Sequence, residues 1–199
     1  MALGKQAKTL TKSQVDAVNA FLLTRRYGLR DQTVFLLSVK AGLRAKEIAN
    51  LKWEMVVGPD GEVGSAIHLP NIATKGNSGR IIPLNKQLRA NLIQLLKQAN
   101  TDKFLKIEDS FVVTTERSDR TSSQAVVNMF KRWYHDIGLL GCSSHSGRRT
   151  FITNAARKIG SVGGSLRDVQ MLAGHSSLSI TQQYIEFDRA AVRRLIECV

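Results

Sequence analysis

The sequence is poor in cysteine and in long hydrophobic stretches. Only two cysteines, Cys142 and Cys198, occur in 199 residues, which excludes a disulfide scaffold. Neither lies in a His/Cys cluster with metal-ligand spacing, so a structural zinc is not expected. The longest apolar runs, such as VFLL at 34–37, are far shorter than the roughly 20 residues of a transmembrane helix. The first residues, MALGKQAKTLTKSQ, lack the apolar core of a secretory signal. These absences favour a cytosolic protein.

Acidic residues are also scarce. There are 16 Asp and Glu against 29 Lys and Arg, which gives a net charge of +13. A basic excess of this size favours a polyanionic partner, because each phosphate contact releases condensed counterions. Nucleic acid is the leading candidate. An anionic membrane surface is the alternative, but no segment has the pattern of a basic amphipathic anchor.

What is present is the composition of a folded, mostly helical domain. Hydrophobic residues make up 43% and charged residues 23% of the chain, enough for a substantial core. Segments 65–70 and 79–84 resemble strands around a polar, glycine-containing turn, which predicts a small antiparallel sheet. The fold class is therefore α+β, mostly helical with one small sheet. Predicted helices, some with Ser/Thr caps at Thr11 and at Ser122 or Ser123, cover 11–26, 30–42 (ending at Gly42), 44–53, 85–100, 122–138, 145–160, 166–174, 176–187 and 188–199.

Several polar residues stand out against this background. His145 and Arg148 are three residues apart near a helix start, which places both on one face. Arg44 follows a Gly-Leu turn, and Lys75 lies at the tip of the predicted hairpin. Taken singly, such residues are more often structural or solvated than catalytic. Their significance depends on the set and its order.

His175 and Tyr184, in LAGHSSLSITQQYI, complete the set. Nine residues on one unbroken helix turn through about 900°, which would place the two side chains on opposite faces. The two serines at 176–177 supply a cap and predict a break, so that a new helix starts at a different angle. The break allows His175 and Tyr184 to share one site.

The ordered set resembles the tyrosine recombinase (phage integrase) family. AGLRAKEIANLKW resembles the first arginine box of that family, including the acidic Glu47. TKGNSGRIIPL resembles its lysine hairpin, HSGRRTFIT its His-x-x-Arg box, and LAGHSSLSITQQYI its closing box. The resemblance runs from residue 28 to 188. It predicts as catalytic residues Arg44, Lys75, His145, Arg148, His175 and Tyr184.

The resemblance implies a site-specific recombinase of mobile elements that cuts and rejoins double-stranded DNA without metal, cofactor or ATP. Tyr184 attacks a phosphodiester and leaves a 3′-phosphotyrosyl enzyme and a free 5′-hydroxyl. Arginine forks suit the non-bridging phosphate oxygens, and a lysine on a hairpin suits protonation of the leaving oxygen. The two histidines add a hydrogen bond or a proton shuttle. The cationic pocket helps the phenol, whose free pKa is near 10, to lose its proton.

The sequence departs from the family pattern in two places. Gly147 and Arg149 flank Arg148, where a bulky apolar residue and a histidine are usual. No helical core-binding domain precedes the first box, so the chain resembles a lone catalytic domain. The expected organisation is a basic arm at 1–10, a catalytic domain at 11–187 and a C-terminal helix at 188–199. That helix packs on its own domain or on a neighbouring protomer, in a tetramer on DNA.

Two other functions fit the same sequence. A type IB topoisomerase-like enzyme shares the tyrosine chemistry but rejoins the same strand as a monomer. A non-catalytic DNA-binding regulator would keep the fold, although a decayed site is expected to lose members of the set. With half of the usual DNA clamp absent, an accessory DNA-binding protein is a further candidate partner. The expected location is the cytoplasm, with nucleoid association in a prokaryotic or phage-infected cell.

Overall fold

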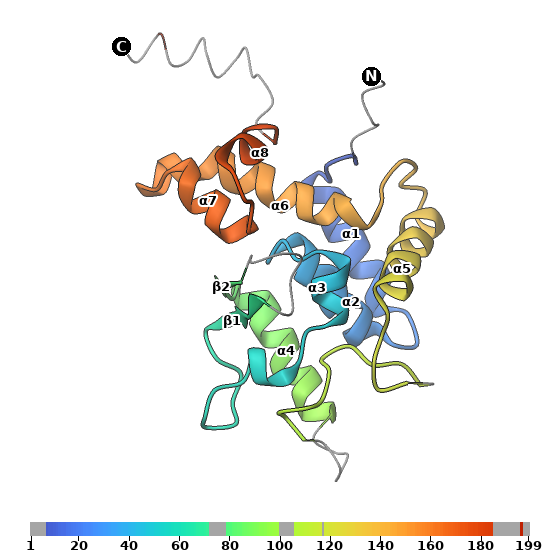
Figure 1. The fold of residues 1–199 in the computed structure, drawn as a ribbon. Coiled ribbons are helices and arrows are strands. Elements are labelled where there is room, and N and C mark those ends of the chain that lie inside the picture. The colour runs from blue at the N-terminus through green and yellow to red at the C-terminus, as the bar shows by residue number, and fades with distance from the viewer. Residues whose placement is uncertain (1–6, 72–78, 100–105, 117, 185–195, 197–199) are drawn as a thin grey trace.

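The computed structural model describes residues 7–71, 79–99, 106–116, 118–184 and 196 (Figure 1). Lys75 and nearly all of the predicted C-terminal helix, 188–199, lie outside these residues. The helices are α1 Lys12–Leu23, α2 Gly28–Val39, α3 Ala45–Ala49, α4 Lys86–Ala99, α5 Ser123–Asp136, α6 Ser144–Lys158, α7 Leu166–Ala173 and α8 Leu178–Gln182. Over the same described residues there are also two 3-10 turns, η1 Trp53–Met55 and η3 Ile159–Val162, and two strands, β1 Ala66–Leu69 and β2 Arg80–Pro83.

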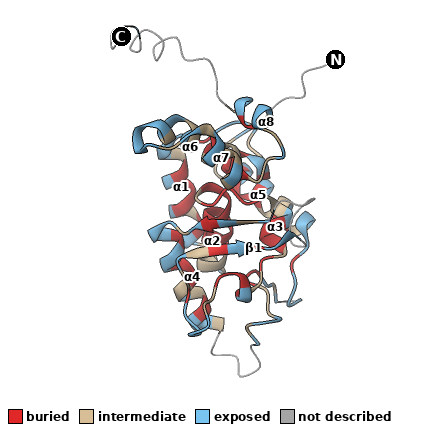
Figure 2. Cartoon of the chain, turned by 60° about the vertical axis from the view of Figure 1, so that its left-hand side comes forward, coloured by how far each residue is buried: buried red, intermediate tan, exposed pale blue. Residues whose placement is uncertain are grey.

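Helix α2 forms the centre of the core. Every residue from Asp31 to Val39 is buried, because α1, α4 and α6 pack around it. Figure 2 shows the buried residues concentrated in α2 and on the sides of the helices that face it. Aromatic rings from α5 extend this core: Phe130 lies 6.5 Å from Phe35 and 5.2 Å from Trp133, centroid to centroid. A helix surrounded in this way is buried on every side, so its polar residues Asp31, Gln32, Thr33 and Ser38 are buried along with the apolar ones.

The sheet is a two-stranded antiparallel hairpin in which Ala66 pairs with Pro83 and Leu69 with Arg80. Its base is closed by Asn71, whose side-chain oxygen accepts a hydrogen bond from the backbone N–H of Gly79 at 2.7 Å. Strand β2 packs against α7. The hairpin therefore brings Arg80, the first residue of β2, close to the end of that helix.

A second, smaller core joins α6 to α7. Ile152 of α6 and Val169 and Ala173 of α7 are buried against each other. In Figure 1, α6 runs across the molecule beside α2 and α3, and α7 and α8 lie at one end of it. A pocket is lined by residues of α7 and α8 together with Arg44, the N-cap of α3.

The predicted α+β architecture is confirmed, but several helices end earlier than expected: α1 ends at Leu23 rather than at 26, and α2 at Val39 rather than at Gly42. The caps at Thr11 and Ser122 and the antiparallel pairing of the strands are observed. The helix expected over 44–53 ends at Ala49 instead. Beyond it the backbone pairs with a distant segment, since Val112 N–H donates to Leu51 O at 2.8 Å and Trp53 N–H to Ser110 O at 3.0 Å. Tertiary hydrogen bonds replace the helical ones there.

The segment before α1 is attached to the domain at the residues described. Leu10 is buried, and its N–H donates to Thr150 Oγ1 of α6 at 2.7 Å. Lys8 Nζ donates to the carbonyl of Leu140 at 3.1 Å. Of the arm expected over 1–10, residues 1–6 lie outside the described residues. Within the described ranges, no helix has the length and hydropathy that a membrane-spanning segment needs.

Candidate active site

The C-terminal end of α7 forms the floor of the candidate site. Gly174 adopts the left-handed conformation, with φ at 61°, and so reverses the chain direction. The N–H groups of His175 and Gly174 bond back to the carbonyls of Gln170 and Met171. The carbonyls that follow are left without helical partners, at the negative end of the helix dipole.

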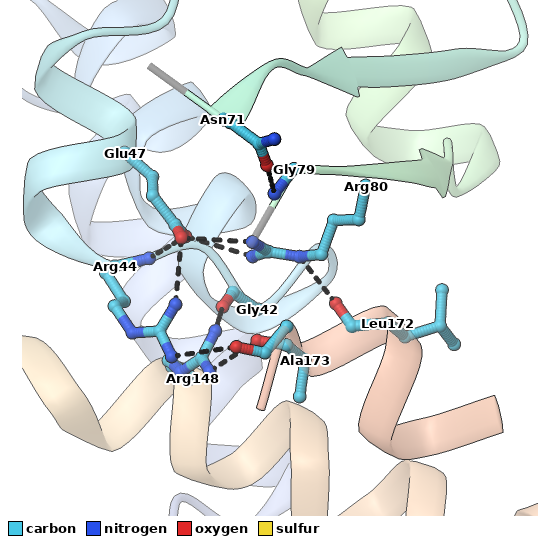
Figure 3. Close-up of polar contacts among 10 residues, drawn as sticks. Gly42, Arg44, Glu47, Asn71, Gly79, Arg80, Arg148, Leu172 and Ala173 are labelled. Atoms are coloured by element: carbon cyan, nitrogen blue, oxygen red, sulfur yellow. Dashed lines mark hydrogen bonds and ion pairs between the residues drawn. The ribbon is translucent and has the colours of Figure 1, made fainter. Parts of the chain in front are cut away.

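Three successive carbonyls at this helix end each accept a hydrogen bond from a different arginine (Figure 3). Arg80 Nε donates to Leu172 O at 2.8 Å, Arg148 Nη2 to Ala173 O at 2.7 Å and Arg44 Nη2 to Gly174 O at 3.5 Å. The arginines come from β2, from α6 and from the N-cap of α3. One helix end thus gathers cations from three elements far apart in the chain.

Arg148 is the more deeply buried of the two predicted arginines. Its exposed fraction is 4%, and Nη1 also donates to the carbonyl of Gly42 at 2.5 Å. Gly42 takes φ at 67° in the turn after α2. Burial, together with the nearby Arg44 charge, lowers the pKa of Arg148 to about 10. The guanidinium is therefore still a cation at neutral pH.

Glu47 lies between Arg44 and Arg80, and each of its two carboxylate oxygens accepts two hydrogen bonds (Figure 3). This carboxylate is 1% exposed. It accepts from Arg44 through the backbone N–H and Nη1, both at 2.9 Å, and from Arg80 through Nη1 and Nη2, both at 3.0 Å. Burial alone would raise the pKa of Glu47, but hydrogen bonds and charges from Arg80 and Arg44 outweigh it and hold that pKa below its ordinary value.

Arg80 was not among the predicted site residues, yet it lines the site pocket. In the structure its side chain is 6% exposed and its donors face Glu47 and Leu172. The sequence signal for this pairing is weak, because 33 residues separate Arg80 from Glu47.

His175 and Tyr184 meet across the predicted helix break. Ser177 is the N-cap of α8, so α8 starts at a new angle after α7 has ended. The His175 and Tyr184 rings stack with centroids 5.4 Å apart and planes at 24°. The Tyr184 carbonyl accepts from Thr153 Oγ1 of α6 at 3.3 Å, which ties the tyrosine to the helix that carries Arg148.

Thr181, which was not among the predicted site residues, forms a hydrogen bond with the ring of His175. Its hydroxyl lies 2.9 Å from His175 Nδ1, and the residue is fully buried. Burial, and then the positive charges of Arg148, Arg44 and Arg80, lower the pKa of His175 to about 4. The imidazole is therefore neutral at pH 7. Its spacing of three residues before Tyr184, on one face of a helix turn, was the available sequence signal for Thr181.

Five of the six predicted site residues line one pocket of about 990 Å³. They are Arg44, His145, Arg148, His175 and Tyr184. His145 lies at the first turn of α6 and is exposed to solvent. The sixth residue, Lys75, lies outside the described residues. The part of the chain that the structure describes contains no group of three His, Cys, Asp or Glu side chains placed to hold a metal ion.

Known proteins with similar sequences and folds cover nearly the whole chain. A model of the phage integrase family matches residues 8–190. Tyrosine recombinase XerA of Pyrococcus horikoshii is 30% identical over 194 residues, 97% of this chain and 63% of that protein. Tyrosine recombinase XerD of Ralstonia nicotianae is 30% identical over 190 residues, 94% of this chain and 58% of that protein. The chain therefore spans about three fifths of the length of these relatives.

The fold is shared with a solved protein–DNA complex. The Tn1549 transposon integrase, in complex with a circular intermediate DNA, superposes with a TM-score of 0.72 at 18% identity, over 100% of this chain and 68% of that one. The family match, the ordered residues and the shared fold agree with one another. The chain belongs to the phage integrase family.

Proposed function

We propose that the chain is a site-specific DNA recombinase that cuts and rejoins strands through a covalent 3′-phosphotyrosyl intermediate. The observation that carries this proposal is the position of Tyr184. A tyrosine stacks on a neutral histidine in a pocket that also contains Arg44 and Arg148. That arrangement suits a phenolic nucleophile facing an anionic substrate.

In the proposed step, Tyr184 Oη attacks phosphorus and a new P–O bond forms. The bond from phosphorus to the 5′-oxygen breaks, and its electron pair stays on that oxygen. Arg44 and Arg148 donate to the non-bridging oxygens, where negative charge increases. His175 is neutral and can accept the phenolic proton. Lys75 supplies a proton to the leaving 5′-oxygen, and His145 adds a donor at the pocket rim. A 5′-hydroxyl from another strand reverses the step.

The proposed partner is double-stranded DNA. The net charge of +13 and the fold shared with a DNA-bound transposon integrase support this assignment. We further propose self-association on DNA, through a tetramer in which residues 188–199 contact a neighbouring protomer. Phosphate contacts position such a protein without reading sequence.

The test is covalent trapping on a nicked suicide substrate drawn from pooled sequences of the encoding element. The wild-type protein is expected to give a slowly migrating protein–DNA band on a denaturing gel, and Tyr184→Phe no band. Tyr27→Phe is the matched control, because Tyr27 lies outside the site pocket. It should retain the band. A band that persists in Tyr184→Phe would contradict the assignment of the nucleophile.

Binding, relaxation and strand-exchange assays on the same proteins separate the other two functions. Salt-sensitive DNA binding without a covalent band from any variant would favour a binding-only regulator. A covalent band together with relaxation of supercoiled DNA, but no exchange between two duplexes, would favour a topoisomerase-like enzyme.

A further inference from the structure

The charges in the pocket wall raise a question about Arg80. Arg44, Arg80 and Arg148 bring three positive charges close to a single carboxylate, Glu47, so the group carries two net positive charges. Glu47 divides its four hydrogen bonds equally between Arg44 and Arg80. Arg44 keeps 28% of its side chain exposed, whereas Arg80 keeps 6%. Both side chains line the pocket, and Arg44 is the one more accessible to an anion that enters it.

A buried carboxylate that loses a donor is left with unsatisfied acceptor positions, which is energetically costly. It therefore bonds more closely to the donors that remain. Without Arg80, both oxygens of Glu47 would have Arg44 as their charged partner. The Arg44 guanidinium would then be drawn away from the pocket and toward the carboxylate. The net positive charge offered to an anion would also fall by one.

The fold around Arg80 is shaped to keep it in this place. Its Nε bonds to Leu172 O, so the guanidinium is fixed at the end of α7 as well as to α3. A Cβ on Gly174 would lie 2.8 Å from Arg80 Nη1, so the glycine admits the side chain. The arginine therefore joins β2, α3 and α7 at one point.

We propose that Arg80 is a positioning residue for the cleavage reaction. Because it makes two of the four hydrogen bonds that Glu47 accepts, it leaves the guanidinium of Arg44 available to the substrate phosphate. This inference rests on the proposed function. Arg80 acts through Glu47 and Arg44 and does not touch the DNA.

The experiment compares four proteins: wild type, Arg80→Met, Glu47→Gln and the double variant Arg80→Met/Glu47→Gln. The measured quantity is the single-turnover rate of covalent complex formation at saturating DNA, at a temperature where circular dichroism shows every variant folded. Arg80→Met is expected to lower the rate about 10- to 100-fold. The double variant restores the net charge and releases Arg44 from a carboxylate, so it should recover about tenfold of that loss.

Arg89→Met is the matched control for removing a bonded arginine. Arg89 of α4 donates to the carbonyls of Gly64 and Val63, which precede β1, and lies outside the pocket. Its rate should stay within about twofold of wild type. A merely structural role for Arg80 predicts a lower melting temperature with an unchanged rate, and that result would overturn the proposal. A double variant no faster than Arg80→Met would overturn it as well.

Failure of the proposed function gives a different pattern. If the wild type forms no covalent complex, the function is wrong, and the inference is then judged by affinity for a labelled mixed-sequence duplex. Charge balance predicts about three- to tenfold weaker binding for Arg80→Met and recovery in the double variant. Equal affinities across the set would overturn the inference by itself.

Discussion

At the scale of single residues, the order of the polar residues along the chain predicted which side chains share a pocket, Lys75 excepted because it lies outside the described residues, but not what supports them. Arg44, Arg148, His175 and Tyr184 were identified from local motifs, and the structure brings them to one pocket. The pairing of Glu47 with Arg80 could not be predicted, because it joins elements that meet only in the folded chain. Thr181 was missed because its spacing of three residues before Tyr184 is a weak signal in a polar stretch.

Thr181 gives a prediction at this scale. Thr181→Val keeps the side-chain volume but removes the hydroxyl beside His175 Nδ1. The imidazole would lose the contact that fixes its orientation, and we expect the rate of covalent complex formation to fall about tenfold, as for one lost hydrogen bond. Thr181→Ser keeps the hydroxyl and should stay within about threefold of wild type. Equal rates for the two variants would contradict the role.

At the scale of helices and strands, one departure from the family pattern has a packing reason. Gly147 on α6 lies against Ser38 on α2, and a Cβ at position 147 would come within 2.5 Å of Ser38 Oγ. The two helices can approach closely only because a hydrogen replaces a side chain there. This contact holds Arg148, the next residue, against the turn at Gly42.

We expect Gly147→Ala to lower the free energy of unfolding by about 1–3 kcal/mol, the usual cost of overpacking. Thermal unfolding should show this as a melting temperature lower by about 2–4 °C per kcal/mol. Gly160→Ala is the control, since a Cβ at that position meets no atom within 4 Å. A Gly147→Ala protein as stable as the Gly160→Ala control would show that α2 and α6 tolerate a wider separation.

Helix positions were predictable where the apolar spacing and the caps agreed, as at Thr11 for α1 and Ser122 for α5. The prediction failed over 50–53, where apolar residues continue at helical spacing. There the backbone bonds to residues 110–112 instead. Such pairing depends on a segment about 60 residues away, which periodicity does not reveal.

At the scale of the whole molecule, the site makes stability depend on pH. The unfolded chain binds a proton at His175 below its ordinary pKa of 6.5, whereas the folded chain does so only near pH 4. The contribution of His175 to the free energy of unfolding is therefore complete above pH 6.5 and is lost as the pH is lowered toward 4. Glu47 acts in the same direction at lower pH, because its folded pKa is depressed and its contribution is lost as it protonates.

The measurement is urea unfolding at pH 7 and pH 5 for the wild type and His175→Asn. The wild type should lose about 1–2 kcal/mol from His175 over this interval, a figure reduced for solvent screening of a half-exposed ring. The free energy of unfolding of His175→Asn should therefore fall less than that of the wild type between pH 7 and pH 5, and the difference should equal the contribution of His175. An identical pH response in both proteins would exclude His175 as the source.

The attachment of three arginines to one helix end has a consequence for how such a protein changes over time. Leu172, Ala173 and Gly174 hold the cations, whereas the tyrosine arrives on the chain that follows. The grip on an anion is therefore assembled independently of the group that reacts. Substitutions over 178–184 can alter, slow or abolish the chemistry while the grip remains intact. Under the proposed function, a catalyst and a silent occupant of the same DNA site are only a few substitutions apart.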